Sequence, residues 1–279
     1  MTHAQFEIFS NQAVAACAVL YFLVFLAHLA AWVSGRVGTG LSAEVAAASG
    51  VSDQTASVGS SGSSSTGSGS VAVAARPSTG GGRNERSELF SRIALAVTVV
   101  AALVHFAALV SRGLAADPAR VPWGNMYEFT LTATFVVVAL FLVMYRRFDL
   151  AWLAPVVSLF VLTVLMIDVL VLYERVTPLR DALQSPWLVI HVVAAIIATG
   201  AFTMGGMCSV LYLVKERALS RGGAQRGYLT QVPPLKALDR LAYRWHAFAF
   251  PVWTFAALIA GPIWANYAWG RYWGWDPKE

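Results

Sequence analysis

Separate apolar blocks of about twenty residues each recur along this chain and constrain its fold more than any other feature. About twenty apolar residues are what an α-helix needs to span the hydrocarbon core of a bilayer. Only 13% of the 279 residues are charged, about half the usual share in a soluble domain. We therefore expect an all-α, polytopic membrane protein. The composition excludes a soluble globular enzyme, a disordered chain and a coiled coil.

Six of these blocks are long enough to cross a membrane, and together they predict a transmembrane helical bundle. The residues before the first block contain no Lys or Arg, and no small-residue cleavage site follows a short apolar core. We therefore interpret the first block as a retained helix rather than a signal peptide. The predicted spans are residues 13–33, 93–110, 129–145, 150–173, 187–214 and 245–264.

Lys and Arg are distributed unequally between the segments that connect these spans. The segments after the first, third and fifth spans carry fourteen of the twenty, and those on the other side carry six. Because cytoplasmic loops are enriched in positive charge, we place the N-terminus and the segment after the sixth span outside. The net charge of +5 then reflects cytoplasmic loops, and we expect no nucleic-acid partner.

We divide the chain into four regions. The segment between residues 46 and 82 is rich in Ser, Gly, Ala and Thr, which cannot bury enough apolar surface to offset the entropy of ordering. We expect a flexible cytoplasmic linker there. The regions are a first transmembrane helix (1–33), a Ser/Gly-rich linker (34–91), a helical membrane domain (92–263) and a tryptophan-rich segment (264–279).

The tryptophan-rich segment holds four of the ten tryptophans within its sixteen residues, with glycines between them. Physical reasoning leaves two interpretations open. The rings form either an aromatic belt at headgroup depth or a platform for a planar ligand, which stacked rings and close-approaching glycine backbone would suit. The four are Trp264, Trp269, Trp273 and Trp275.

Three stretches resemble the cytochrome c assembly family, in particular its CcsA/ResC type from the system II pathway. The segment that ends in Trp-Gly-Trp-Asp-Pro-Lys-Glu279 resembles the family's "WWD" segment. Asn125-Met-Tyr-Glu128 resembles a family motif that opens a helix. Ser185-Pro-Trp-Leu-Val-Ile-His191 resembles the family's Ser-x-Trp-x-x-x-His segment. The resemblance covers about residues 120–279.

The resemblance implies haem handling. In the family, the WWD segment holds haem at the outer membrane surface between two external histidines, and His191 matches the first of them. Ser185 and Pro186 independently predict a helix start just before His191. We expect His191 to be an axial ligand of the haem iron, and the resemblance assigns haem contacts to Trp264, Trp269, Trp273, Trp275 and Asp276.

The resemblance also implies a membrane partner of the CcsB/ResB type and an apocytochrome c whose CxxCH cysteines receive the haem. It implies a bacterial plasma membrane location with the haem site on the extracytoplasmic side. Any enzymatic activity, the formation of thioether bonds, would belong to the holocytochrome c synthase complex. The family continues beyond its WWD segment with further spans, a membrane-embedded histidine and the second external histidine, so we expect a C-terminally truncated sequence.

Two other functions fit the hydropathy: a secondary transporter of a non-haem substrate, and an interaction scaffold with an aromatic tail. A transporter predicts internal repeats, and we find no convincing one.

Asp168 within the fourth span is either a functional group or a protonated or hydrogen-bonded residue. His105 is a candidate inner haem contact, Glu128 a helix cap or haem-site residue, and Arg271 and Lys278 are candidate partners of the haem propionates or headgroup anchors.

Overall fold

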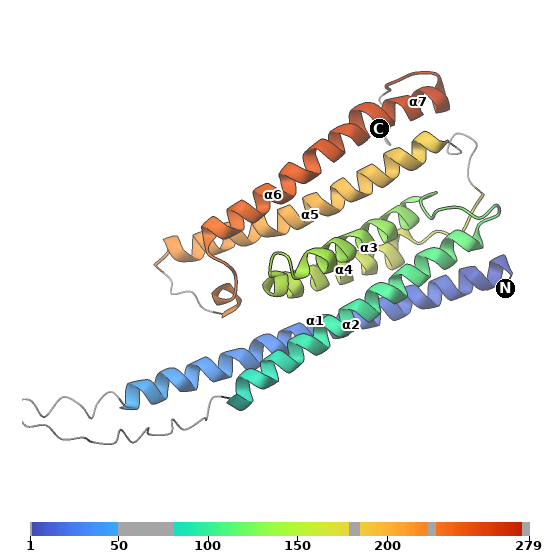
Figure 1. Ribbon diagram of the computed structural model, residues 1–279. Helices are drawn as coiled ribbons and strands as arrows, with labels where there is room; N and C mark the ends of the chain where they lie inside the picture. The colour runs from blue at the N-terminus through green and yellow to red at the C-terminus, as the bar shows by residue number, and fades with distance from the viewer. Residues whose placement is uncertain (1, 50–80, 179–184, 223–226, 275–279) are drawn as a thin grey trace, which may run out of the picture. The chain divides into compact units, whose positions relative to one another are not determined.

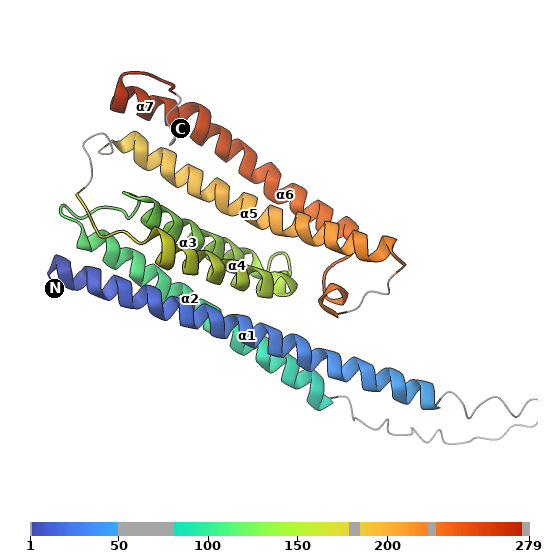
Figure 2. The same cartoon turned by 180° about the vertical axis from the view of Figure 1, so that it is seen from behind.

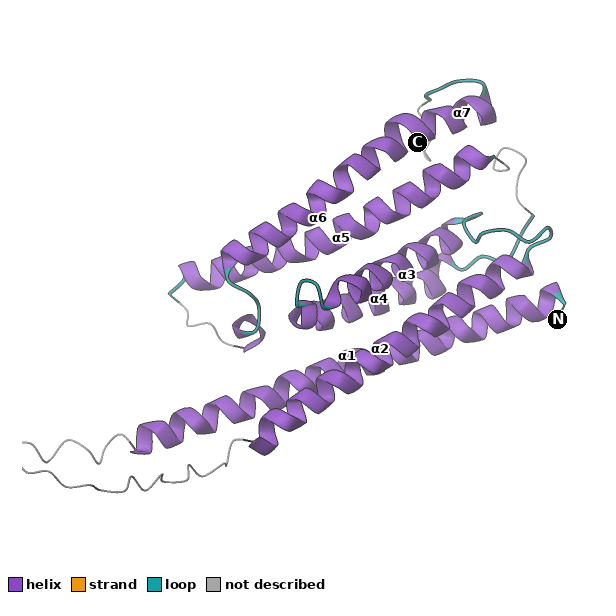
Figure 3. Cartoon of the chain, viewed as in Figure 1, coloured by secondary structure: helices purple, strands orange, loops and turns teal. Residues whose placement is uncertain are grey.

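The computed structural model describes residues 2–49, 81–178, 185–222 and 227–274. Within these ranges the chain is helical apart from short loops and turns and contains no strand (Figure 3). The prediction of an all-α protein is confirmed. The chain divides into two compact units, one of Met1–Leu26 with Ala94–Glu279 and one of Ala27–Ile93.

The second unit contains the later part of α1 (His3–Ser49) and the first part of α2 (Gly81–Ala115). The predicted linker falls in this unit, and its residues 50–80 lie outside the described residues. The first unit contains the remaining helices and every candidate site residue that the structure describes.

Among the described residues, six helical segments are long and apolar enough to cross a membrane, and each overlaps one of the six predicted spans. The protein is therefore a multi-pass membrane protein. The segments are His3–Ala31, Glu88–Ala115, Met126–Tyr145, Leu150–Leu172, Pro186–Ser220 and Leu235–Trp269.

Two of these segments contain a π-helical turn, which ends the fourth segment and interrupts the sixth. The fourth consists of η1 (Leu150–Leu153), α4 (Ala154–Ile167) and the π-turn η2 (Asp168–Leu172). The sixth consists of α6 (Leu235–Phe255), the π-turn η5 (Ala256–Ala260) and α7 (Gly261–Trp269). Such turns occur mostly as single insertions in α-helices and are frequent at functional sites.

Side-chain caps define the starts of α3 (Met126–Tyr145) and α5 (Pro186–Ser220). The Asn125 side-chain oxygen accepts a hydrogen bond from the backbone N–H of Glu128 at 2.9 Å. The Ser185 hydroxyl oxygen accepts one from the backbone N–H of Trp187 at 3.3 Å. Each bond satisfies a helix N–H that has no partner within the helix, so the residues that the sequence marks as helix starts do begin these helices.

Helix α5 packs against α6 and α3 inside the first unit (Figure 1). Small residues allow this close approach: a Cβ on Gly200 would lie 3.2 Å from Leu140 and Val136, and one on Gly205 would lie 2.6 Å from the ring of His246. Both views place the start of α5, the start of α3 and α7 at the same end of this unit (Figures 1 and 2). That end carries the candidate site.

Candidate functional site

A cavity of about 270 Å³ lies where the start of α5 meets the segment that runs from α6 through η5 into α7. Aromatic and aliphatic groups form most of its wall. A concave, mostly apolar site with few polar groups is typical of small-molecule binding. Its ring-bearing residues are His191, Trp253, Pro262, Trp264, Tyr272 and Trp273.

The imidazole of His191 is held by one nitrogen. Its Nδ1 lies 2.9 Å from the backbone oxygen of Ala256 in η5. Because a carbonyl oxygen only accepts hydrogen bonds, Nδ1 carries a proton, and in the neutral imidazole Nε2 then keeps its lone pair. Nε2 has no hydrogen-bond partner within the described part of the chain. In its neutral form His191 therefore presents Nε2 at the cavity wall as a nitrogen that can bind a metal.

Trp264 is 7% exposed. It lines the cavity and also packs in a hydrophobic core. It packs with Leu188 and Val192 of α5, and the partly buried Trp123 packs against the same cluster. The Trp269 ring meets the Trp264 ring edge-on, with centroids 4.9 Å apart. Trp269 therefore supports Trp264.

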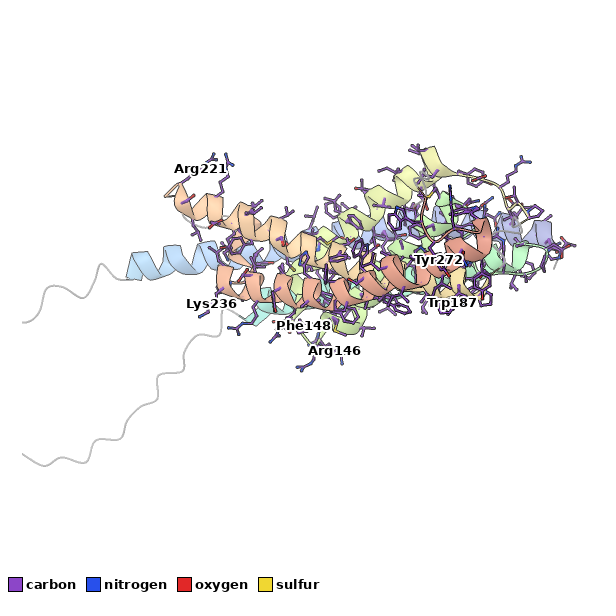
Figure 4. The ribbon with its side chains drawn as sticks, turned by 90° about the horizontal axis from the view of Figure 1, so that it is seen from above. Arg146, Phe148, Trp187, Arg221, Lys236 and Tyr272 are labelled. Carbon is purple, nitrogen blue, oxygen red and sulfur yellow. The ribbon has the colours of Figure 1, made fainter. Side chains whose placement is uncertain are left out.

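Tyr272 and Trp273 line the cavity from the segment after α7 and are 64% and 53% exposed. Trp275, Asp276 and Lys278, which the sequence also placed at the site, lie outside the described residues. Tyr272 and Trp187 lie toward one end of the first unit, whereas Arg221 and Lys236 lie toward the other (Figure 4).

Sequence reasoning missed Trp253, Gly261 and Pro262. Trp253 lies on α6 eleven residues before Trp264, and both rings line the cavity. Gly261 faces His191: a Cβ on Gly261 would lie 3.1 Å from Nδ1 of the imidazole. The available signal was the Gly-Pro pair inside an apolar span, which marks a break in regular helix.

A buried ionic cluster lies at the C-terminal end of α2 and the N-terminal end of α3. The Glu128 carboxylate accepts hydrogen bonds from Nε of Arg112 at 3.2 Å, from Nη1 of Arg120 at 2.7 Å and from the backbone N–H of Gly124 at 2.8 Å. Glu128 and Arg112 are almost completely buried. The cluster fixes the loop before α3, and this loop carries Trp123 to the Trp264 core.

Arg112 makes three further contacts, which explain how a guanidinium can be buried here. Its Nη2 donates to the backbone oxygen of Glu174, its Nη1 lies 3.9 Å from the carboxylate of Glu7, and its Cζ lies 4.9 Å from the centre of the Tyr127 ring. Sequence reasoning counted Arg112 as a loop charge, because it follows the second apolar block.

Asp168 begins the π-turn η2 and is 0% exposed. Neither carboxylate oxygen has a hydrogen-bond partner among the described residues. Arg112 and Tyr127 lie within electrostatic range of it. The interpretation of Asp168 as a hydrogen-bonded residue therefore has no partner among the described residues, and a functional role and a protonated carboxyl stay predictions.

Both imidazole nitrogens of His105 already have hydrogen-bond partners, so neither is free to bind iron. Its Nε2 donates to the backbone oxygen of Leu131 at 3.1 Å, and its Nδ1 lies 3.4 Å from the Tyr21 hydroxyl. The ring is completely buried between the rings of Tyr21 and Phe135. It is a hydrogen-bonded core residue, and the idea that it contacts haem is not supported.

A family model described as cytochrome C assembly protein matches residues 123–279, which is more than half of the chain. The chain belongs to the cytochrome c assembly protein family. The match begins at Trp123 and covers α3 to α7, and so includes the whole described cavity.

Curated relatives agree with the family model. A cytochrome c biogenesis protein CcsA from Guillardia theta is 30% identical over 175 residues, which are 57% of this chain and 58% of that protein. The CcsA of Trieres chinensis is 30% identical over 224 residues, 68% of this chain and 69% of that protein. The CcsA of Synechococcus sp. (strain JA-2-3B'a(2-13)) is 26% identical over 257 residues, 72% of this chain and 73% of that protein.

The match to the Guillardia theta protein thus spans less than two thirds of that protein. No solved structure matches the chain.

Proposed function

We propose that this protein takes part in cytochrome c biogenesis by binding haem and presenting it for covalent attachment to apocytochrome c. Family membership and the CcsA relatives support the general role. The observation that carries the specific role is His191, whose imidazole stands on the wall of an aromatic cavity with Nδ1 bonded to Ala256 and Nε2 unpaired among the described residues.

The described residues fit haem as the cargo of this site. An imidazole with its Nδ1 hydrogen bonded to a carbonyl is the usual state of a metal-ligating histidine, because the second bond orients the ring and raises its basicity. The flat rings of Trp264, Trp273 and Tyr272 suit a macrocycle with π-faces. Axial histidine ligation and the polarity around the iron then tune its redox potential.

The reaction that this site would serve is the addition of a cysteine S–H across a haem vinyl group. Sulfur bonds to the inner vinyl carbon and the hydrogen goes to the outer carbon, so no leaving group is needed. The reaction requires ferrous haem and reduced thiols. The protein contributes position and exclusion of competing oxidation, while the reactive vinyl groups belong to the haem.

We further propose a bacterial plasma membrane location with the site on the extracytoplasmic side, because the Lys- and Arg-rich connecting segments belong to the opposite side. A CcsB/ResB-type membrane protein and an apocytochrome c would be the partners. The exposed Trp273 and Tyr272 are accessible to such partners.

The test is optical. Full-length protein, produced where haem is plentiful and purified in detergent, should show a Soret absorption band. His191→Ala should weaken the band, and added imidazole should restore it by replacing the missing ligand.

His246→Ala is the matched control. The Nδ1 of His246 is also bonded to a backbone oxygen, that of Ala242 at 2.7 Å, but His246 lies ten residues before Ala256, about 15 Å along the helix. The control should keep the band. A colourless full-length protein, or a band unaffected by His191→Ala, would overturn the proposal.

An interaction scaffold is the second candidate, and the exposure of three rings favours it: Tyr267 at 71%, together with Tyr272 and Trp273. A scaffold predicts that Trp273→Ala abolishes co-purification with a membrane partner and leaves the haem content unchanged. Haem delivery predicts that the same substitution lowers the haem content.

A further inference from the structure

The π-turn η5 stands directly before a Gly-Pro pair. Pro262 has no N–H, and in a regular α-helix its ring would clash with the backbone oxygen of the residue four positions earlier. The wider turn of η5 accommodates the proline. The backbone N–H of Gly261 donates to the oxygen of Ala256, five residues earlier, which closes this turn.

The same backbone oxygen of Ala256 accepts the hydrogen bond from Nδ1 of His191, at 2.9 Å. A carbonyl oxygen has two lone pairs and can accept both bonds. The oxygen of Ala256 therefore holds both the hydrogen bond that closes η5 and the hydrogen bond from His191.

Gly261 is the residue that lets the imidazole reach this oxygen. A Cβ at position 261 would lie 3.1 Å from Nδ1 and 3.2 Å from Cε1 of His191, and 3.1 Å from the oxygen of Ala256. All three distances are shorter than ordinary van der Waals contacts. A methyl group at position 261 would therefore crowd both the imidazole of His191 and the oxygen of Ala256. The ring would have to move away from Ala256 by some tenths of an ångström.

The hydrogen bond between His191 and Ala256 determines which imidazole nitrogen is available to iron. With Nδ1 donating to Ala256, the ring presents Nε2; without that acceptor, the ring can take either tautomer and rotate. We propose that η5 and Gly261 form a positioning device that fixes His191 as an Nε2 ligand. This inference rests on the proposed function, in which His191 ligates haem iron.

Gly261 acts through His191 and is a positioning residue. Loss of a hydrogen-bond partner of a metal-ligating histidine lowers metal affinity or activity about 10- to 100-fold. We therefore expect full-length Gly261→Ala protein to bind haem about 10- to 100-fold more weakly, with a shifted midpoint potential for the haem it retains. Added imidazole should restore the Soret band, as it should for His191→Ala.

Gly206→Ala is the matched control. Gly206 also lies within a membrane helix, and a Cβ there would have nothing within 4 Å. This variant should keep the parental affinity and potential. Gly261→Ala protein that equals the Gly206→Ala control in both quantities would overturn the inference. If His191→Ala loses haem while Gly261→Ala does not, only the positioning role fails; if His191→Ala keeps its haem, the proposed function fails.

If the Gly261→Ala variant does not fold, a second measurement on the unsubstituted protein still tests the inference. Solid-state NMR of the haem-free, full-length protein with ¹⁵N-labelled histidine reports which ring nitrogen is protonated, with His191→Ala used to assign the signal. We expect Nδ1 of His191 to be protonated and Nε2 not. The opposite tautomer, or equal populations of both, would overturn the inference.

Discussion

The imidazole of His191 and the indole of Trp264 lie nearly parallel, with ring centroids 6.2 Å apart and 15° between the planes. One ring comes from the second turn of α5 and the other from the first turn of α7. The nitrogen that we propose as an iron ligand and a buried aromatic wall are thereby held in one orientation by two packed helices.

Trp264→Ala should destabilise the protein by about 3–5 kcal/mol, because it removes a large ring from a packed core and leaves a cavity beside Trp269. Thermal unfolding in detergent measures this loss. Trp273→Ala, at a half-exposed ring, should change stability by less than about 0.5 kcal/mol. Equal effects of the two substitutions would contradict the core role of Trp264.

Glu128→Gln should destabilise the protein by about 3–5 kcal/mol, because the buried Arg112 would lose the carboxylate that accepts its hydrogen bond and keep only the more distant carboxylate of Glu7. The midpoint of thermal unfolding reports the loss. Glu174→Gln serves as the control, since the exposed Glu174 reaches Arg112 through its backbone oxygen, which the substitution keeps. A Glu128→Gln protein as stable as that control would show that the cluster is not a stabilising ion pair.

Asp168→Asn should leave stability unchanged or raise it. The carboxylates of Glu128 and Glu7 lie against Arg112, and Glu128 also pairs with Arg120, whereas neither oxygen of Asp168 has a described hydrogen-bond partner. A buried charge without a partner is costly, and asparagine keeps the shape without the charge. Chemical unfolding in detergent measures the difference. A loss above about 1 kcal/mol would mean that an ionised Asp168 stabilises Arg112.

Ser185→Ala should destabilise α5 by about 1 kcal/mol through loss of the N-cap, and Ser185→Asp should retain the cap. Hydrogen exchange at the backbone amides of the first turn of α5 detects this locally. Faster exchange in Ser185→Ala than in Ser185→Asp is the expected result. Equal exchange in the two variants would show that the hydroxyl does not hold the start of α5.

Hydropathy was sufficient to predict the six spans, because their length and apolarity follow from the thickness of a bilayer. The start of α5 could also be predicted, since Ser185 and Pro186 act through local geometry. His191 could be placed near that start by counting residues. Its hydrogen bond to Ala256 could not, because the partner is 65 residues away on another helix.

The π-turns and the burial of Arg112 escaped prediction for a related reason. A single inserted residue leaves the 3.6-residue hydrophobic pattern of a fully apolar span almost unchanged, so η5 has no periodic signature. Arg112 follows an apolar block and resembles a loop charge until tertiary packing brings Glu128 to it. Where a buried charge lies depends on its partners, and these come from distant segments.

The most direct test of the central claim is a cryo-electron microscopy structure of the full-length protein purified with haem. The account predicts porphyrin density in the cavity beside Trp264, with iron bonded to Nε2 of His191 and Nδ1 still directed at Ala256. Porphyrin density elsewhere in the protein, with the His191 ring turned away from the iron, would contradict it.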